Sequence, residues 1–251
     1  MSLIVQKFGG SSVRDRARLL RAMTIVKEAW ERGDEVVVVL SAQGDTTDEL
    51  LARARALCAA PPQRELDALL ATGETASVAL GAISLASLGV PAVSLSGWQV
   101  PVRTDGRHGG ANVTGVDAAR LRRELAAGRV ALVAGFQGVD EAGDVTTLGR
   151  GGSDTSAVAL AAFLGAERCI IYTDVDGVYT TDPRVCPAAR RLETVSCDHM
   201  LRLAANGAQV LHDRSVELAR EYAIPIEVLS AFTGEPGTIV GDLESSYPNE
   251  T

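Results

Sequence analysis

Short apolar runs alternate with longer segments of helical spacing along this sequence, and this alternation restricts the chain to few folds. Glu35–Leu40 is β-branched and apolar almost throughout, which is typical of a strand buried on both faces. Val13–Arg32 precedes it with apolar residues at helical spacing, and Leu3–Phe8 is a further strand candidate. Strands joined by such helices make right-handed crossovers. We therefore predict an α/β fold with a mostly parallel central sheet covered by helices on both faces.

The remaining elements follow the same alternation. The predicted strands are Leu3–Phe8, Glu35–Leu40, Ala92–Leu95, Val130–Ala134, Cys169–Tyr172 and Ile226–Leu229. The predicted helices are Val13–Arg32, Asp48–Ala60, Gln63–Leu88, Asp117–Ala127, Asp154–Leu164, Cys197–Asn206 and Asp213–Tyr222. We expect an interruption of the third helix near Gly73. No linker with a shifted composition is visible, so we expect one domain over residues 1–241, followed by a polar tail over 242–251.

Composition and charge exclude several classes of protein. The net charge of −8 argues against a general nucleic-acid binder, which needs positive surface for phosphates. A content of 46% apolar and 22% charged residues is not that of a disordered chain. The longest purely apolar runs, such as Val36–Leu40, are too short to span a bilayer, and Met1–Lys7 lacks the pattern of a secretion signal. We expect a cytoplasmic protein with no membrane partner.

The cysteines and histidines indicate neither a metal site nor a hydrolase. The four cysteines form no C-x-x-C pair and have no cluster of histidines beside them, so we expect neither zinc nor a disulfide framework. None of the three histidines has a nucleophile at a recognisable spacing, so a catalytic triad has no support. We interpret His212 as a structural hydrogen-bonding residue rather than a base.

In open α/β sheets, ligands bind beyond the carboxyl ends of the strands, and polar loops follow two of the predicted strands. Lys7–Ser12 could bind a phosphate through two glycines, a helix N-terminus and a lysine. The alternative to phosphate binding is a tight strand-to-helix turn with Ser12 as N-cap. Ser41–Asp48 offers hydroxyls and helix-start amides; the alternative is capping by Thr47 or Asp48.

Two further loops carry candidate binding residues. In Thr147–Thr155, Arg150 stands among three glycines, and a forked pair with a carboxylate is its natural role; the alternative is a solvated glycine-rich turn. This loop does not match a Walker A motif. In Tyr172–Arg184, Asp176-Gly177 predicts a hairpin turn, and the closing Glu of an EF-hand is missing. Any function there would come from the polar side chains around the turn.

Eight segments in the same order resemble the aspartokinases of the amino acid kinase superfamily. They are VQKFGGSSV (5–13), SAQGDTTDEL (41–50), TGE (72–74), SLSGWQ (94–99), VAGFQGV (133–139), TTLGRGGSDTSAVALAAFLGA (146–166), YTDVDGVYTTDPR (172–184) and GAQVLHDRSVELA (207–219). The resemblance implies a three-layer αβα sandwich that holds the amino acid in its N-terminal part and MgATP in its C-terminal part, about 146–241. The implied reaction moves the γ-phosphoryl group of ATP to the β-carboxylate of L-aspartate, giving 4-phospho-L-aspartate for lysine and threonine biosynthesis.

The resemblance also assigns roles to residues. Lys7 and Asp174 are the implied catalytic residues, and Mg²⁺ is expected to be held through the ATP phosphates, with no protein metal site. The implied substrate-binding residues are Ser41, Thr47, Glu74, Arg150, Ser153 and Asp154, of which Glu74 binds the ammonium and Arg150 a carboxylate. The implied nucleotide-binding residues are Lys7, Gly9, Gly10, Ser11, Thr173, Asp174, Tyr179, Asp182, Arg184, Gln209 and Val210. A carboxylate is already a nucleophile at neutral pH, so no general base is required.

The sequence departs from the family pattern at Gln209, where the family usually has a lysine at the nucleotide phosphates. Losing this cation would remove about 2–4 kcal/mol of charge stabilisation, unless Arg184 or Arg214 compensates. Asp213 stands where the family commonly has proline, and we have no physical account of that change. The resemblance ends near Gly241, so we expect no ACT regulatory domain, and control by lysine or threonine only through a separate subunit.

Three alternatives to an aspartate kinase are considered. A kinase of another acidic amino acid keeps the same chemistry, although Glu74 and Arg150 together favour a free α-amino acid. A weakly catalytic ligand-binding subunit of the same fold is motivated by Gln209. A dinucleotide dehydrogenase lacks its G-x-G-x-x-G motif after the first strand. As partners we expect L-aspartate or a close analogue and a second copy of the chain.

Overall fold

A central sheet of eight strands organises the molecule. The computed structural model describes residues 2–181, 186, 188–205, 210–233 and 236–241. The strand order is β10-β12-β11-β9-β1-β2-β6-β3, and within this sheet only the pair β11–β12 is antiparallel. The bounds are β1 Leu3–Phe8, β2 Glu35–Leu40, β3 Ala92–Leu95, β6 Val130–Ala134, β9 Arg168–Thr173, β10 Thr194–Val195, β11 Ile226–Ser230 and β12 Thr238–Val240. The predicted mostly parallel sheet is confirmed.

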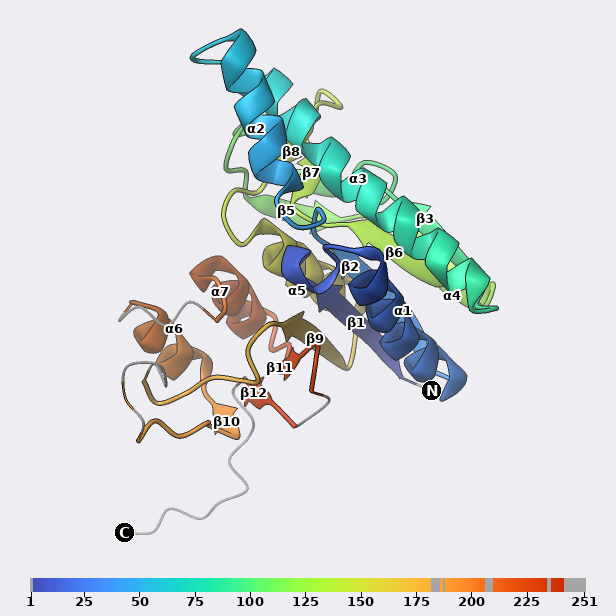
Figure 1. The fold of residues 1–251 in the computed structure, drawn as a ribbon, viewed down its shortest axis with the longest axis vertical. Helices are drawn as coiled ribbons and strands as arrows, with labels where there is room; N and C mark the ends of the chain where they lie inside the picture. The colour runs from blue at the N-terminus through green and yellow to red at the C-terminus, as the bar shows by residue number, and fades with distance from the viewer. Residues whose placement is uncertain (1, 182–185, 187, 206–209, 234–235, 242–251) are drawn as a thin grey trace.

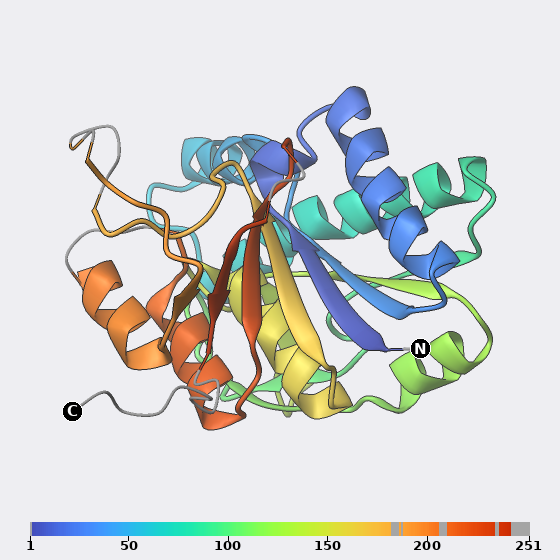
Figure 2. The ribbon, with the colours of Figure 1, turned by 90° about the horizontal axis from the view of Figure 1, so that it is seen from below.

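Helices cover both faces of this sheet, as the edge-on view in Figure 2 shows. On one face lie α1 (Arg16–Glu31) and α3 (Gln63–Ser87), with α2 (Thr46–Leu57) packed against α3 (Figure 1). The helices of the other face are α4 (Ala119–Ala126), α5 (Gly152–Leu164), α6 (Cys197–Ala205) and α7 (Asp213–Glu221). The predicted three-layer arrangement is therefore confirmed.

The strand β2 shows why the sheet lies at the centre. Val36, Val38 and Leu40 belong to the hydrophobic cluster beneath α1 and α3. Val37 and Val39 point the other way, into the cluster beneath α5. All five side chains are at most 1% exposed. At about 1.5–3 kcal/mol per buried side chain, this one strand contributes on the order of 10 kcal/mol before chain entropy is subtracted.

A second sheet of four short strands was not predicted. It has the order β5-β4-β7-β8, with β4 Val102–Thr104, β5 Val113–Val116, β7 Gln137–Val139 and β8 Val145–Thr147. β8 packs against α3. These strands have three or four residues and contain Gly, Thr and Gln rather than apolar runs. Their composition therefore does not indicate a strand, and they are strands because they pair with one another.

Two expectations about local structure were wrong. α3 runs through Gly73 without interruption. The glycine instead allows the helix to lie close to Ala42, since a Cβ at Gly73 would lie 2.9 Å from Ala42 Cβ. Asp176-Gly177 does not close a two-residue hairpin. The backbone after it pairs instead with a more distant segment, since Thr180 N–H donates to the Arg190 carbonyl at 3.0 Å.

Both capping alternatives for the first two loops are also wrong. Gly10–Ser12 forms a 3-10 turn, and the cap of α1 is Asp15, whose Oδ1 accepts from Arg18 N–H at 2.9 Å. α2 starts at Thr46 after Asp45, so Thr47 and Asp48 lie inside the helix. The polar side chains of these loops are therefore not used as helix caps where the sequence suggested it.

Among the described helices, α3 alone is long and apolar enough to cross a membrane by length and composition. In the structure it packs against α1, α2, β3, β6 and β8. Its buried face carries two carboxylates, Asp67 and Glu74, beside small residues. These contacts make α3 a core helix of this fold, and the carboxylates bring it to the candidate site.

Candidate functional site

The turn after β1 meets the start of α5. Lys7 is 8% exposed, and its Nζ lies 2.5 Å from Asp154 Oδ1 in the first turn of α5. A buried ammonium is tolerable because this carboxylate compensates its charge. Gly10 allows the turn to lie against the loop after β2, because a Cβ there would be 2.7 Å from the Ala42 carbonyl oxygen. The two loops are also joined by a hydrogen bond from Gly44 N–H to the Gly10 carbonyl at 3.1 Å.

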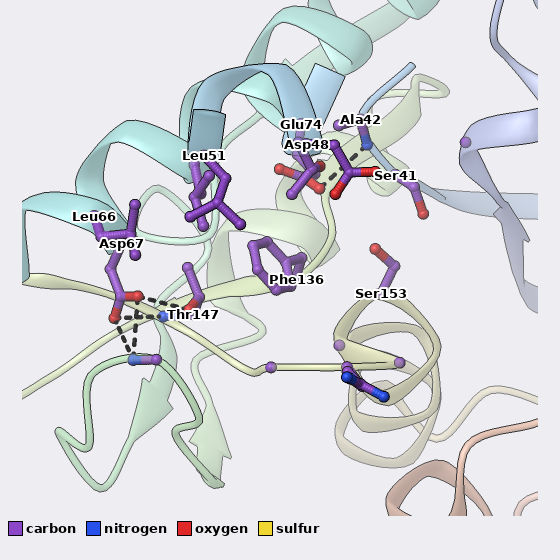
Figure 3. A pocket seen from close by; sticks show the side chains of 18 of the residues that line it. Ser41, Ala42, Asp48, Leu51, Leu66, Asp67, Glu74, Phe136, Thr147 and Ser153 are labelled. Atoms are coloured by element: carbon purple, nitrogen blue, oxygen red, sulfur yellow. Dashed lines mark hydrogen bonds between the residues drawn. The ribbon is translucent and has the colours of Figure 1, made fainter. Parts of the chain in front are cut away.

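A pocket of about 730 Å³, called here the first pocket, opens at this edge of the sheet. Figure 3 shows it between α2 and α3 on one side and the start of α5 on the other. It brings together eight of the predicted site residues: Lys7, Gly10, Ser41, Thr47, Glu74, Arg150, Ser153 and Asp154. These residues come from four separate parts of the chain, so the pocket exists only in the folded molecule.

Glu74 contributes a buried carboxylate from α3. It is 3% exposed, and its Oε1 accepts from Ala42 N–H at 3.2 Å. Its Oε2 has no hydrogen-bond partner among the residues that the structure describes. Burial raises the pKa of Glu74 from 4.5 to about 7, and the Ala42 N–H opposes this rise. A buried oxygen without a partner at the wall of a pocket suits a cationic ligand group such as an ammonium.

Arg150 stands between two glycines with left-handed backbone, Gly149 at φ +73° and Gly151 at φ +65°. Its side chain is exposed at the wall of the pocket and forms no ion pair with any residue that the structure describes. Immediately after it, α5 begins with Gly152, and the helix N-terminus with its free amides faces the same space. A cationic side chain and a helix N-terminus together favour an anionic ligand.

A second pocket of about 370 Å³ adjoins the first and shares Arg150, Gly151 and Asp154 with it. Val210 and His212 line its other side. The His212 carbonyl accepts from Ser215 N–H at 2.9 Å, but its buried Nδ1 has no partner among the described residues. The predicted structural hydrogen bonding of His212 thus belongs to its backbone, while the ring packs against Gly151.

Five further predicted nucleotide residues that the structure describes, Gly9, Ser11, Thr173, Asp174 and Tyr179, line neither pocket. Gly9 and Ser11 lie in the turn after β1, and the Gly9 N–H already donates to the Tyr172 carbonyl at 3.4 Å. Thr173 ends β9 and Asp174 follows it at the neighbouring strand end, where Thr173 Oγ1 donates to Asp174 Oδ1 at 3.2 Å.

Tyr179 lies further along, and its hydroxyl donates to the Asp176 carboxylate at 3.0 and 3.1 Å. The remaining residues Asp182, Arg184 and Gln209 lie outside the described part of the chain. Arg214, which was expected to compensate for Gln209, donates to the Leu148 carbonyl at 3.1 Å. The roles of all these residues stay predictions.

Sequence reasoning missed Phe136 and Asp67, which both line the first pocket. Phe136 has a left-handed backbone at φ +66°, which is unusual for a bulky residue and is held by Ser156 Oγ accepting its N–H at 3.0 Å. Asp67 is 1% exposed on the apolar face of α3, seven residues before Glu74. A carboxylate at a core position was the available signal for Asp67, and Phe136 lies within a segment that carries the family resemblance.

One group of potential metal ligands occurs among the described residues. His108, Asp140 and Asp144 have ligand atoms within 4.8 Å of one another. Asp144 is already held by Arg64, whose Nη2 and Nε donate at 2.5 and 2.9 Å. This guanidinium holds the pKa of Asp144 below its usual range. Because a cation already neutralises Asp144, we assign no metal to this group.

Comparisons with known proteins agree with the motifs. A family model described as "Amino acid kinase family" matches residues 2–230. The aspartokinase of Geobacillus stearothermophilus is 53% identical over 240 residues, which cover 96% of this chain and 59% of that relative. The chain spans about 60% of the length of the curated relatives it matches. The predicted resemblance to aspartokinases is thereby confirmed.

Solved structures show the same fold. The aspartate kinase from Synechocystis has a TM-score of 0.86 at 47% identity, with 96% of this chain and 40% of that chain covered. Aspartokinase III of E. coli in complex with aspartate and ADP has a TM-score of 0.87 at 30% identity, with 97% of this chain and 65% of that chain covered.

Proposed function

Since this chain belongs to the amino acid kinase family, we propose that it is an ATP-dependent aspartate kinase. Its reaction is the transfer of the γ-phosphoryl group of ATP to the β-carboxylate of L-aspartate. One observation carries the proposal: Lys7, Glu74 and Arg150 line a single pocket, although they are far apart in the sequence. A phosphoryl group, an ammonium and a carboxylate are the groups that these three side chains match.

L-aspartate fills the first pocket in this proposal. Its ammonium pairs with the Glu74 carboxylate, whose Oε2 has no partner within the described ranges. Its α-carboxylate takes the guanidinium of Arg150, with Ser153 beside it. Ser41 and Thr47 lie at the same wall and place the β-carboxylate near Lys7. The structure of the E. coli relative was solved with aspartate and ADP bound, which supports this choice of ligands.

The residues present fit the phosphate end of ATP. The N-terminus of α5 lies at the junction of the two pockets, with Lys7 paired to its first turn. The glycines around it leave room for a phosphate close to the backbone, and Val210 lines the second pocket. Mg²⁺ bound to the ATP phosphates would neutralise part of their charge.

The chemistry is a displacement at phosphorus. A β-carboxylate oxygen of aspartate forms a bond to the γ-phosphorus, and the bond from this phosphorus to the β–γ bridging oxygen breaks. ADP leaves with the electron pair, and the product is the acyl phosphate 4-phospho-L-aspartate. No proton moves, so the protein supplies position and charge: Lys7 neutralises the transferred group, and Arg150 and Glu74 orient the acceptor.

Trapping of the acyl phosphate tests the proposal. The purified chain with ATP, Mg²⁺ and hydroxylamine should form aspartyl hydroxamate from L-aspartate at a rate at least tenfold above that from L-glutamate or N-acetyl-L-aspartate. The N-acetyl compound is the matched control, since it keeps both carboxylates and replaces the ammonium that Glu74 binds with a neutral amide. Absence of hydroxamate at high protein concentration refutes aspartate kinase activity, whereas a faster rate with another acidic amino acid transfers the proposal to that acid.

Gln209 provides a second test. If its missing charge limits turnover, then Gln209→Lys should raise kcat about tenfold or more, and the parent chain would act mainly as a ligand-binding subunit. A parent with turnover above about 1 s⁻¹ and no gain in Gln209→Lys excludes that alternative. Gln209→Met, which has a similar size and no charge, is the control.

We also propose that these 251 residues work without lysine or threonine control. The family model matches residues 2–230, and the residues that line both pockets lie within this range. The rate should stay within 20% when either amino acid is added at about 5 mM. Inhibition of the rate by half contradicts the proposal.

We also propose that the chain forms a homodimer. Leu80 and Ile83 on α3 are exposed apolar side chains, which supports this proposal. A monomer mass measured by light scattering overturns it.

A further inference from the structure

A buried carboxylate on α3 takes no part in the steps above. Asp67 is 1% exposed, and it lies two helical turns before Glu74 on the same face of the helix. Both residues line the first pocket. Figure 3 shows that Asp67 points away from Glu74's end of the pocket, toward Thr147 at the end of β8. A buried charge is costly unless hydrogen bonds replace its water, so the partners of Asp67 indicate its role.

Asp67 joins three segments that are distant in the sequence. Its Oδ1 accepts from Thr147 Oγ1 at 2.7 Å, and its Oδ2 accepts from Thr147 N–H at 3.1 Å. The Gly109 N–H donates to the two oxygens at 3.1 and 2.9 Å. His108 Nδ1 lies 3.0 Å from Oδ2 and is the donor, since a carboxylate has no proton to give. The carboxylate thus ties α3 to the β4–β5 loop and to the end of β8.

These contacts lie directly beside the loop that carries Arg150. Thr147 is three residues before Arg150, and its carbonyl accepts from Ala111 N–H at 2.8 Å, which closes the junction. Leu148, the next residue, donates to the Phe136 carbonyl at 2.9 Å. After Leu148 the backbone turns at Gly149 and presents Arg150 to the pocket. A shift of Thr147 would therefore move the guanidinium of Arg150, because the two residues are three positions apart in the chain.

We propose that Asp67 is a positioning residue of the first pocket, which sets the place of Arg150 by holding Thr147 and the Gly109 rim. The inference rests on the proposed function for the identity of the substrate. Asp67 acts through the backbone of these segments and touches no reacting atom. A displacement of a binding group by about 1 Å can cost about a hundredfold in rate, so fixing this loop has a functional consequence.

Asp67→Asn tests the proposal, because an amide keeps the size of the side chain but offers one acceptor oxygen instead of two. We expect the KM for L-aspartate to rise at least tenfold, while the KM for ATP stays within twofold. Glu124→Gln is the matched control: Glu124 is also buried and held by two arginines, at 2.6 and 2.7 Å, but it lies on α4 and lines neither pocket. It should lower Tm and leave both KM values unchanged.

A gentler pair of variants keeps the test valid if Asp67→Asn does not fold. His108→Leu removes one donor to Asp67, whereas His108→Asn places an amide N–H near the position of Nδ1. His108 lines neither pocket. The leucine variant should raise the KM for L-aspartate about threefold, and the asparagine variant should restore it. Equal KM values in all variants that fold, with only Tm lowered, overturn the proposal.

Amide hydrogen exchange separates this inference from the proposed function. Asp67→Asn should speed exchange of the amides of Gly109 and Thr147 and of the loop around Arg150, and Glu124→Gln should not. If the unmodified chain neither phosphorylates nor binds L-aspartate, the proposed function fails, and the exchange data still decide whether Asp67 holds the loop. Unchanged exchange in Asp67→Asn overturns the positioning role even when aspartate kinase activity is present.

Discussion

Two buried charged residues are central to the proposed chemistry at the residue scale, and each has a different compensation. Lys7 is paired with Asp154 at 2.5 Å, so its charge is balanced within the protein. In the described part of the chain, the side chain of Glu74 accepts from the Ala42 N–H through Oε1, while Oε2 has no partner. A buried carboxylate with so little compensation responds to pH, because burial raises its pKa.

Removal of the Lys7 charge should reduce turnover strongly. For Lys7→Ala we expect kcat to fall by about 10²–10³-fold, which corresponds to about 3–4 kcal/mol of lost charge stabilisation at the transferred phosphoryl group. The variant also leaves Asp154 without its cation, so Tm should fall. Initial rates of ADP release measure the effect, with Lys27→Ala as the control, since Lys27 pairs with Glu31 on the outside of α1. A kcat within threefold of the parent contradicts the assigned role.

Binding of aspartate should weaken as the pH falls through 7. Burial raises the pKa of Glu74 to about 7, so below this pH the carboxyl is protonated and no longer pairs with an ammonium. We expect the KM for L-aspartate to rise about tenfold per pH unit between pH 6.5 and 5, while the KM for ATP changes little. Glu74→Gln should have a high KM at every pH. A KM that is flat from pH 5.5 to 8 in the parent shows that Glu74 does not bind the ammonium.

The same raised pKa has a defined effect on stability. The folded state binds the Glu74 proton more tightly than the unfolded state, whose carboxyl has its ordinary pKa of 4.5. The stability that the protonated carboxyl contributes is therefore present below pH 4.5 and lost as the pH rises through 7, by up to about 3 kcal/mol. Glu74→Gln should consequently raise Tm at pH 8 relative to the parent, which differential scanning calorimetry measures. A lower Tm for this variant at pH 8 refutes the sign.

At the scale of elements, the start of α5 joins the two pockets, and its geometry depends on Gly151. This residue has φ +65°, and a Cβ on it would lie 2.2 Å from His212 Cβ, which precedes α7. Gly165, at the other end of α5, also has a left-handed backbone at φ +69°, but nothing lies within 4 Å of its Cβ position. An alanine at Gly165 would therefore meet backbone strain alone, whereas an alanine at Gly151 would meet backbone strain and a steric clash.

This difference predicts unequal effects of two alanine substitutions. Gly165→Ala should cost about 1–2 kcal/mol of backbone strain and lower Tm by about 2–8 °C, with unchanged kinetics. Gly151→Ala should lower Tm further and raise the KM for ATP at least tenfold, because it pushes α7 and the second pocket away from α5. Thermal unfolding and initial rates of both variants provide the comparison. Equal effects of the two substitutions would show that α7 does not pack on Gly151 as described.

Sequence reasoning predicted those elements whose own residues are enough to indicate a strand or a helix. β2 and β6 have apolar runs that indicate buried strands, β1 is a short strand candidate, and the predicted bounds of all three agree with the structure. The four strands of the second sheet could not be predicted, because Gly, Thr and Gln in runs of three or four residues indicate no strand until a partner is known. Gly73 was interpreted as a helix break because its neighbour Ala42 lies 31 positions away in the sequence.

The candidate site divides in the same way. The places of Lys7 and Arg150 in the first pocket were predictable, since Lys7 stands at the end of β1 just before two glycines, and Arg150 stands in a glycine-rich loop before α5. Asp67 was not, because its partners Gly109 and Thr147 are 42 and 80 positions away in the sequence. A buried carboxylate has no local signature of its role, and only the tertiary hydrogen bonds reveal what it holds.

At the scale of the whole molecule, the two hydrophobic clusters share one sheet. Neighbouring residues of β2 alternate between the cluster under α1 and α3 and the cluster under α5. If the strands of the sheet come apart, both clusters lose the strand side chains that they contain. The described part of the chain should therefore unfold as one cooperative unit. The first pocket contains residues from both sides of this arrangement, Glu74 from α3 and Ser153 from α5.

Ligands that bind this pocket should therefore stabilise the entire unit. Saturation at about 100 times Kd with L-aspartate and a non-hydrolysable ATP analogue with Mg²⁺ contributes about 2.7 kcal/mol for each independent site. For a chain of this size, one such site corresponds to a rise in Tm of about 5–10 °C. Calorimetry should show a single transition that moves as a whole, with D-aspartate in place of L-aspartate as the control for stereospecific binding. Two transitions, of which only one responds to ligand, would mean that the helices on the two faces of the sheet unfold independently and that the pocket is built on one of them.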